Sequence, residues 1–157
     1  MSPIETIKSN LTQARARLNH VFDQVGSRWD TQVYSDGAAW TVRQLAIHLM
    51  ISDKGQNATV MGIARGEEGV PADFDLERYN RRSVEKRAEA TIEEVRAALA
   101  TSFGERVAWL DALDEAALTR TGRHGSMQIM SVAAILNLMA DHERTHAADI
   151  AKALKIE

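Results

Sequence analysis

Four long segments of this chain space their apolar residues three and four positions apart, which is the period of an amphipathic helix. Each segment follows a residue type that caps helices, namely Ser2, Thr41, Thr91 and Ser131. In the first three segments a Glu or Gln stands three positions after the cap, which completes the pattern of a capping box. Spacing and caps together predict four helices, over residues 3–25, 42–65, 92–113 and 132–154.

The connections between these segments are polar. The stretch from Gly66 to Ala90 begins as a loop, and its part from Asp73 towards Arg87 has the pattern of a short helix. A second connection runs from Asp114 to Gln128, and no segment alternates long enough to predict a strand. We therefore expect an all-α four-helix bundle, formed by residues 1–157 as a single domain, with a long crossover before the third long helix.

Composition excludes several classes of function. The chain has 157 residues, enough to bury a core without disulfides, and its formal net charge of −3 gives no support to nucleic-acid binding. It contains no cysteine, which excludes thiolate zinc sites and a cysteine nucleophile. No apolar run approaches the length of a membrane helix, and the first residues lack a signal pattern. We expect a cytoplasmic protein with neither a nucleic-acid nor a membrane partner.

Three of the five histidines fall on faces that the apolar pattern turns inward. His142 and His146 are four positions apart, so they project from the same side of the last helix. His48 follows Leu45 by about one turn on the second helix. An inward histidine is often a hydrogen-bonded core residue, but three together favour a divalent metal, and an open fourth position is typical of catalytic zinc sites. We predict that His48, His142 and His146 bind this metal.

The remaining histidines are assigned no role in this prediction. His20 lies off the apolar series of the first helix, so we expect it on the surface. His124 lies in a glycine-containing loop, and we expect it to be solvated. Past His48 the inward face of the second helix becomes small and polar, with Ser52, Gly55 and Thr59, which indicates a cavity.

Residues 142–146 also match H-E-x-x-H, the metalloprotease pattern in which the glutamate is the general base. Such enzymes take a third ligand from further along the chain, but only 11 residues follow His146. Asp149 and Lys152 stand where the extended motif requires glycine and histidine. We therefore expect no peptide cleavage, and Glu143 is interpreted as a solvent-facing carboxylate or as one that supports a ligand.

Several polar residues near the predicted cavity are candidates for substrate contacts: Ser52, Asp53, Gln56, Tyr79 and Asn80. Each is, taken alone, more typical of a helix surface or of ordinary packing. Arg43 and Arg144 are candidates for contacts with an anionic substrate, although exposed helical arginines are common.

The segment from Trp40 to Leu49 resembles the second-helix signature of the DinB-like (YfiT-like) metalloenzyme superfamily. Residues 142–150 are similar to the fourth-helix signature of that family, with two histidines four apart. Residues 74–80, together with Ser83 and Val84, resemble the segment before the third helix in the branch that contains mycothiol-dependent maleylpyruvate isomerases. The resemblance covers nearly the whole chain.

This resemblance implies a bundle with up-down-down-up topology, often a homodimer. It implies zinc or nickel held by residues that match His48, His142 and His146. The mycothiol isomerases usually carry a glutamate where His142 stands and an additional C-terminal domain, and these departures weaken the case for isomerisation.

The function expected from this family is thiol-cofactor-dependent transfer, or hydrolysis, of a small molecule. The thiol, such as mycothiol or bacillithiol, would come from outside the protein. Two alternatives stay open: a non-catalytic metal-binding or sensing bundle, and a purely structural dimeric bundle.

Overall fold

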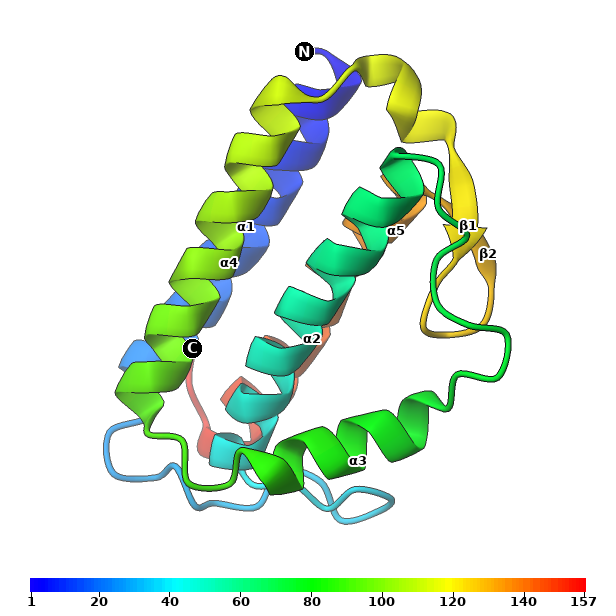
Figure 1. The fold of residues 1–157 in the computed structure, drawn as a ribbon. Coiled ribbons are helices and arrows are strands. Elements are labelled where there is room, and N and C mark those ends of the chain that lie inside the picture. The colour runs from blue at the N-terminus through cyan, green and yellow to red at the C-terminus, as the bar shows by residue number, and fades with distance from the viewer.

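The computed structural model describes residues 1–157 and contains four long helices in one bundle (Figure 1). These helices are α1 Pro3–Asp23, α2 Val42–Ala64, α4 Ile92–Ala112 and α5 Val132–Leu154. Helices α1 and α5 run in one direction and α2 and α4 in the other, which is the up-down-down-up order (Figure 1). The prediction of an all-α four-helix bundle with a long crossover is confirmed.

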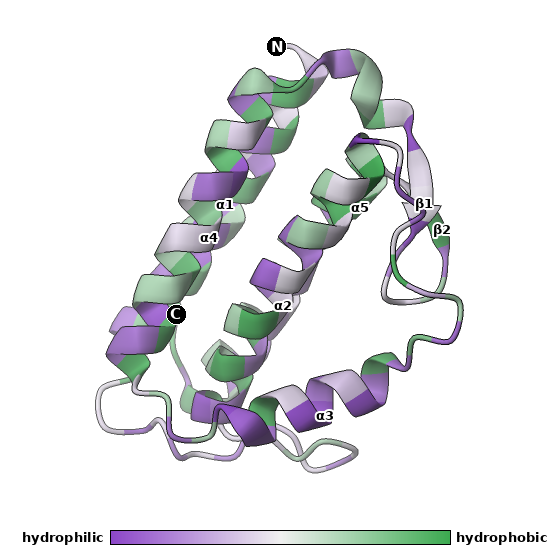
Figure 2. Cartoon of the chain, in the orientation of Figure 1, coloured by the Kyte–Doolittle hydropathy of each residue, from purple (hydrophilic) through white to green (hydrophobic).

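The crossover contains a fifth helix, α3 Leu76–Lys86, which lies outside the bundle and packs against α2 (Figure 1). Its N-cap is Asp75, whose side chain accepts a hydrogen bond from the Arg78 backbone N–H. Figure 2 shows α3 as largely hydrophilic, whereas the four long helices carry hydrophobic residues along their length. None of the helices combines the length and the hydropathy that a membrane-spanning helix requires.

The predicted caps account for where the long helices begin. Ser2 with Glu5, and Thr41 with Gln44, form complete capping boxes with reciprocal hydrogen bonds. Ser131 accepts from the backbone N–H of Ala134, as predicted. At Thr91 only the hydroxyl half of the box forms. The first helix ends at Asp23, two residues before the predicted end.

The connection between α4 and α5 contains two short strands that the sequence pattern does not indicate. This connection holds a 3-10 helix, η1 Glu115–Thr119, followed by strands β1 Thr121–Arg123 and β2 Ile129–Ser131. The two strands pair antiparallel. Each strand has only three residues, too few for an alternating pattern to be recognised in the sequence.

The hairpin is tied to the loop that follows α2. The backbone N–H of Val70 donates to the Arg123 carbonyl over 2.9 Å, and the Arg123 N–H donates to the Glu68 carbonyl over 2.7 Å. Gly69 lies between these bonds with φ +93°, a conformation that L side chains rarely adopt. A Cβ at this position would overlap the backbone of Arg123, so the close approach requires glycine.

The hydrophobic core consists of two clusters, one at each end of the bundle, and all four long helices contribute to both. Between them each helix buries polar side chains instead. This polar layer consists of Arg15 from α1, Asp53 and Asn57 from α2, Ser102 and Arg106 from α4, and Glu143 from α5.

Candidate metal centre

The ε nitrogens of three histidines converge between α2 and α5. His142 Nε2 lies 3.3 Å from His48 Nε2 and 3.0 Å from His146 Nε2. One ligand atom from each of the three side chains lies within 4.8 Å of the other two. Zinc–nitrogen bonds of 2.0–2.1 Å in a tetrahedron place two ligand nitrogens about 3.3 Å apart, so the two measured separations fit such an ion.

All three imidazoles are neutral at pH 7. Burial, together with a smaller effect of nearby histidines, lowers the pKa of His48 to about 4 and that of His142 to about 3. Burial also lowers the pKa of His146, although the charge of Asp149 partly opposes this. Neutral imidazoles keep a lone pair for coordination, and that is the form in which histidine binds metals.

A tyrosine from the loop before α2 fixes the tautomer of His146. The Tyr34 hydroxyl donates to Asp149 Oδ2 over 2.5 Å and lies 2.9 Å from His146 Nδ1. Because the hydroxyl proton goes to the carboxylate, the Tyr34 oxygen accepts from His146 Nδ1–H. The lone pair of His146 therefore lies on Nε2, the atom that faces the other two histidines. A partner of this kind on the outer nitrogen is typical of metal-binding histidines.

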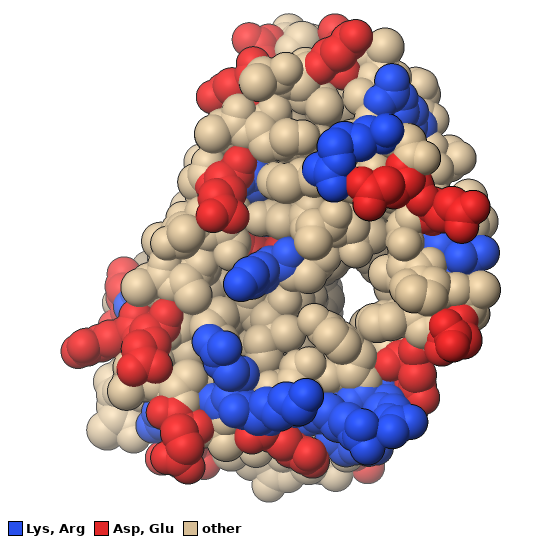
Figure 3. All heavy atoms as spheres, in the orientation of Figure 1, with Lys and Arg blue, Asp and Glu red and all other residues tan.

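The histidines border a pocket of about 560 Å³. The small polar face of α2 forms one wall, with Ser52, Gly55 and Thr59, so the predicted cavity is confirmed. Apolar side chains from the crossover and α5 form other walls, namely Val70, Phe74, Leu76 and Leu138. Figure 3 shows an opening through the molecule beside α2, above α3.

His124 is buried in the wall of this pocket, so the prediction that it is solvated is wrong. The β1–β2 hairpin folds over the pocket and carries the loop histidine with it, which the glycine-containing sequence does not reveal. The backbone N–H of Ser126 donates to His124 Nδ1 over 3.1 Å. The ring proton therefore lies on Nε2, which is 3.0 Å from Gln56 Oε1.

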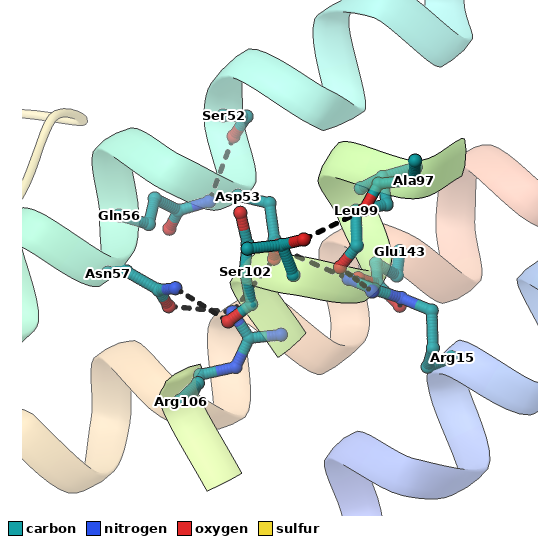
Figure 4. A network of polar contacts seen from close by, with 11 residues as sticks. Arg15, Ser52, Asp53, Gln56, Asn57, Ala97, Leu99, Ser102, Arg106 and Glu143 are labelled. Atoms are coloured by element: carbon teal, nitrogen blue, oxygen red, sulfur yellow. Dashed lines mark hydrogen bonds and ion pairs between the residues drawn. The ribbon is translucent and has the colours of Figure 1, made fainter. Parts of the chain in front are cut away.

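The hydrogen bonds continue from Gln56 to Ser52 in one direction. Gln56 accepts from His124 through Oε1, which leaves its amide Nε2 to donate to Ser52 Oγ over 3.0 Å (Figure 4). The Ser52 oxygen accepts the hydrogen bond from Gln56, so the Ser52 O–H remains available to donate. Since Ser52 stands four positions after His48, both side chains project from one side of α2.

Glu143 lies in the polar layer and not at the histidines, so its expected exposure to solvent is wrong. Arg15 Nε donates to Glu143 Oε1 over 3.1 Å, and Arg15 Nη2 is 3.2 Å from Asp53 Oδ2 (Figure 4). Burial lowers the pKa of Arg15, but bonds and charges from Glu143 and Asp53 outweigh this and raise it. The core-facing stripe of α5 therefore passes through Glu143 and Ala147, and His142 and His146 border the pocket.

The other half of this layer joins α2 to α4. Arg106 Nη1 donates to Asp53 Oδ1 over 2.8 Å and to Asn57 Oδ1 over 2.7 Å (Figure 4). Asp53 therefore faces the layer, which makes it a structural residue and not a substrate contact. Arg106 is fully buried, and the sequence signal for its burial was its position within the apolar series of α4.

The remaining candidates divide between the pocket and the surface. Tyr79 and Asn80 line the pocket with Ser52 and Gln56. Arg43 pairs with exposed Asp30, and Arg144 donates to the Asn10 carbonyl. Neither arginine lines the pocket beside the histidines. His20 is on the surface, as expected.

Comparisons with known proteins agree with this architecture. The sequence model of a protein family described as the DinB superfamily matches residues 10–150. Among solved structures, YfiT from Bacillus subtilis matches with a TM-score of 0.79 and 23% sequence identity, over 97% of this chain and 86% of that one. That protein is described as a probable metal-dependent hydrolase with an unusual four-helix bundle topology. No curated protein matches the chain.

Proposed function

This chain belongs to the DinB superfamily, and from that membership we propose that it is a divalent-metal-dependent enzyme acting on a small molecule. The observation that carries the proposal is the convergence of His48, His142 and His146 at the edge of a pocket large enough for a ligand. The description of YfiT as a probable metal-dependent hydrolase supports the same class of activity.

Three neutral imidazole nitrogens are a donor set that suits zinc and nickel. A divalent ion held by His48, His142 and His146 would supply a Lewis acid for activating water in hydrolysis or a thiol in transfer. The pocket that the three histidines border would give a substrate access to such an ion.

The thiol reaction requires an external cofactor, because the chain contains no cysteine. The resemblance of residues 74–80 to the mycothiol-dependent branch supports a low-molecular-weight thiol such as mycothiol or bacillithiol. We do not extend the proposal to isomerisation, because His142 stands where those isomerases usually carry a glutamate.

The protein's own side chains orient the reactants. Tyr34 and Asp149 hold His146 in the tautomer that presents Nε2. Ser52 offers its O–H to a substrate atom in the pocket, because its oxygen already accepts from Gln56, whose amide His124 orients. Glu143 takes no part in the reaction, because its carboxylate pairs with Arg15.

The test is turnover by protein loaded with zinc or nickel, measured with two substrate panels. One panel pairs mycothiol or bacillithiol with small electrophiles, and the other contains small esters and amides. We expect metal-dependent turnover on one panel, with Glu143→Gln retaining it. Metal-dependent peptide cleavage that disappears in Glu143→Gln would restore the protease interpretation. A filled site without turnover on either panel would favour a non-catalytic metal-binding or sensing bundle.

A further inference from the structure

A second cavity, of about 480 Å³, is lined by the C-terminal part of α3, whereas the pocket beside the histidines is lined by the N-terminal part of that helix. It is enclosed by α2, α3 and α4, with Met50 and Ile51 from α2, Ser83 from α3 and Ala98 from α4. None of these side chains belongs to the metal centre, and the proposed reaction assigns the cavity no role.

The charges that line this cavity are all positive. Lys54, Lys86 and Arg87 face it, and no carboxylate lines it. None of the three side chains forms an ion pair within the protein. Lys and Arg side chains gather over α3 in Figure 3 as a band along the lower edge of the molecule. These cations are therefore unneutralised although the chain carries a net charge of −3.

The second cavity adjoins the metal pocket. Gly55 and Tyr79 line both of them. The Tyr79 hydroxyl lies close to α2, because a Cβ at Gly55 would be 3.4 Å from its oxygen, an ordinary contact distance. Tyr79 thus borders both cavities, and it is an exposed residue. A molecule that occupied both cavities would pass beside Gly55 and Tyr79.

We propose that the cavity between α2, α3 and α4 binds a carboxylate or phosphate group of the molecule whose reactive end lies at the metal centre. Arg87 presents a planar set of N–H donors and Lys54 and Lys86 present ammonium groups, and both types bind carboxylate and phosphate oxygens through charge-assisted hydrogen bonds. The substrate or cofactor is therefore an anionic small molecule. This inference rests on the proposed function for the identity of the reactive end, but the anion site itself does not.

The anion site is tested on metal-free protein, so that failure of the metal proposal does not affect the result. Inorganic phosphate and citrate are titrated separately at constant ionic strength, with amide chemical shifts followed by NMR. We expect saturable shifts at Gly55 and Ser83 with one anion or both, and the stronger of the two identifies the preferred group. Shifts that do not saturate, or that spread evenly over the surface, would overturn the proposal.

The variants distinguish a site from general attraction. The double variant Lys86→Gln/Arg87→Gln removes two cations that line the cavity and should weaken binding about tenfold. The control Arg81→Gln/Arg82→Gln removes the same charge from α3 at positions that do not line the cavity, and we expect less than about a twofold change. Equal losses in both would show diffuse attraction only and would contradict the proposal.

The connection between the cavities is tested on protein whose bound metal has been quantified. Mercaptocarboxylic acids of increasing chain length compete with alkanethiols of the same length for the Co²⁺-loaded protein. The competition gives the relative affinity of the acid and the alkanethiol at each length. We expect one range of lengths at which the acid binds more tightly, with the advantage lost in Lys86→Gln/Arg87→Gln. If no length gives an advantage, the two cavities do not serve one molecule. Absence of Co²⁺ binding would instead contradict the proposed function.

Discussion

The carboxylate of Glu143 lies against the guanidinium of Arg15, with Arg15 Nε 3.1 Å from Oε1 and 3.2 Å from Oε2. Glu143 directly follows His142 in the sequence, but successive helix residues are rotated by about 100°, so their side chains lie on different faces of α5. In the match to H-E-x-x-H the glutamate therefore has a structural partner in the core and does not line the pocket that the two histidines border.

Replacing Glu143 by Gln should destabilise the fold while leaving metal binding intact. The change removes the carboxylate that bonds to the buried Arg15 and leaves Asp53 as its one charged partner, and losing one member of a buried ion pair costs about 3 kcal/mol in the free energy of unfolding. Urea unfolding of the metal-free protein measures this cost. Glu67→Gln is the matched control, because Glu67 pairs with Arg65 on the surface, where such a pair contributes about 0.5 kcal/mol. Equal effects of the two substitutions would contradict the account of the polar layer.

Replacing Tyr34 by Phe should weaken metal binding. The hydroxyl is the acceptor that holds His146 Nδ1–H, and loss of such a partner typically reduces metal affinity about 10- to 100-fold. A competition titration with a chromophoric zinc chelator measures the affinity. Tyr79→Phe provides the comparison, because the Tyr79 hydroxyl forms no hydrogen bond to any histidine in the structure and its loss should leave affinity unchanged. An unchanged affinity in Tyr34→Phe would show that the tyrosine does not position the ligand.

Replacing Gly69 by Ala should destabilise the protein by about 2 kcal/mol or more, because φ is +93° and the new methyl group overlaps the Arg123 backbone. The loop would also separate from the β1–β2 hairpin, which carries the pocket residue His124. Thermal unfolding measures the change. Gly104→Ala, at an exposed position of α4 with open space around it, should instead stabilise by about 1 kcal/mol. A neutral Gly69→Ala substitution would refute the close approach.

We also predict a homodimer, on the strength of the family resemblance. Sedimentation equilibrium should give a mass of twice 17.4 kDa at high protein concentration. A single species of 17.4 kDa at every concentration would contradict this prediction.

The long helices were predictable because their signals are local. Caps such as Ser2 and Thr41 and an apolar period over some 20 residues suffice to locate a helix without knowing what it packs against. The convergence of His48 with His142 was predictable for the same reason, since both lie on helix faces next to the core. The boundary of the core-facing side of α5 was not predictable, because spacings of three and four residues fit a stripe through His142 and one through Glu143 equally well. Arg15, whose ion pair places Glu143 in the core, is 128 residues away in the sequence.

The burial of His124 and the hairpin that carries it could not be predicted from the sequence. The strands have three residues each, and their pairing depends on contacts with Glu68 and Val70, some 50 residues earlier in the chain. A glycine-containing polar segment is normally a solvated loop, and only the tertiary fold turns its histidine towards Gln56. The cations around the second cavity were likewise visible in the sequence, but their lack of carboxylate partners was not.

The most direct test of this account is the stoichiometry of bound metal in the purified protein, measured by mass spectrometry after dialysis against zinc or nickel. We predict one ion per chain in the wild type and in His20→Ala, which removes an exposed histidine outside the site. We predict a loss of bound metal by orders of magnitude in His142→Ala and in His146→Ala. Full occupancy in either of these two variants, or no bound metal in the wild type, would contradict the assignment of His48, His142 and His146 as the metal ligands.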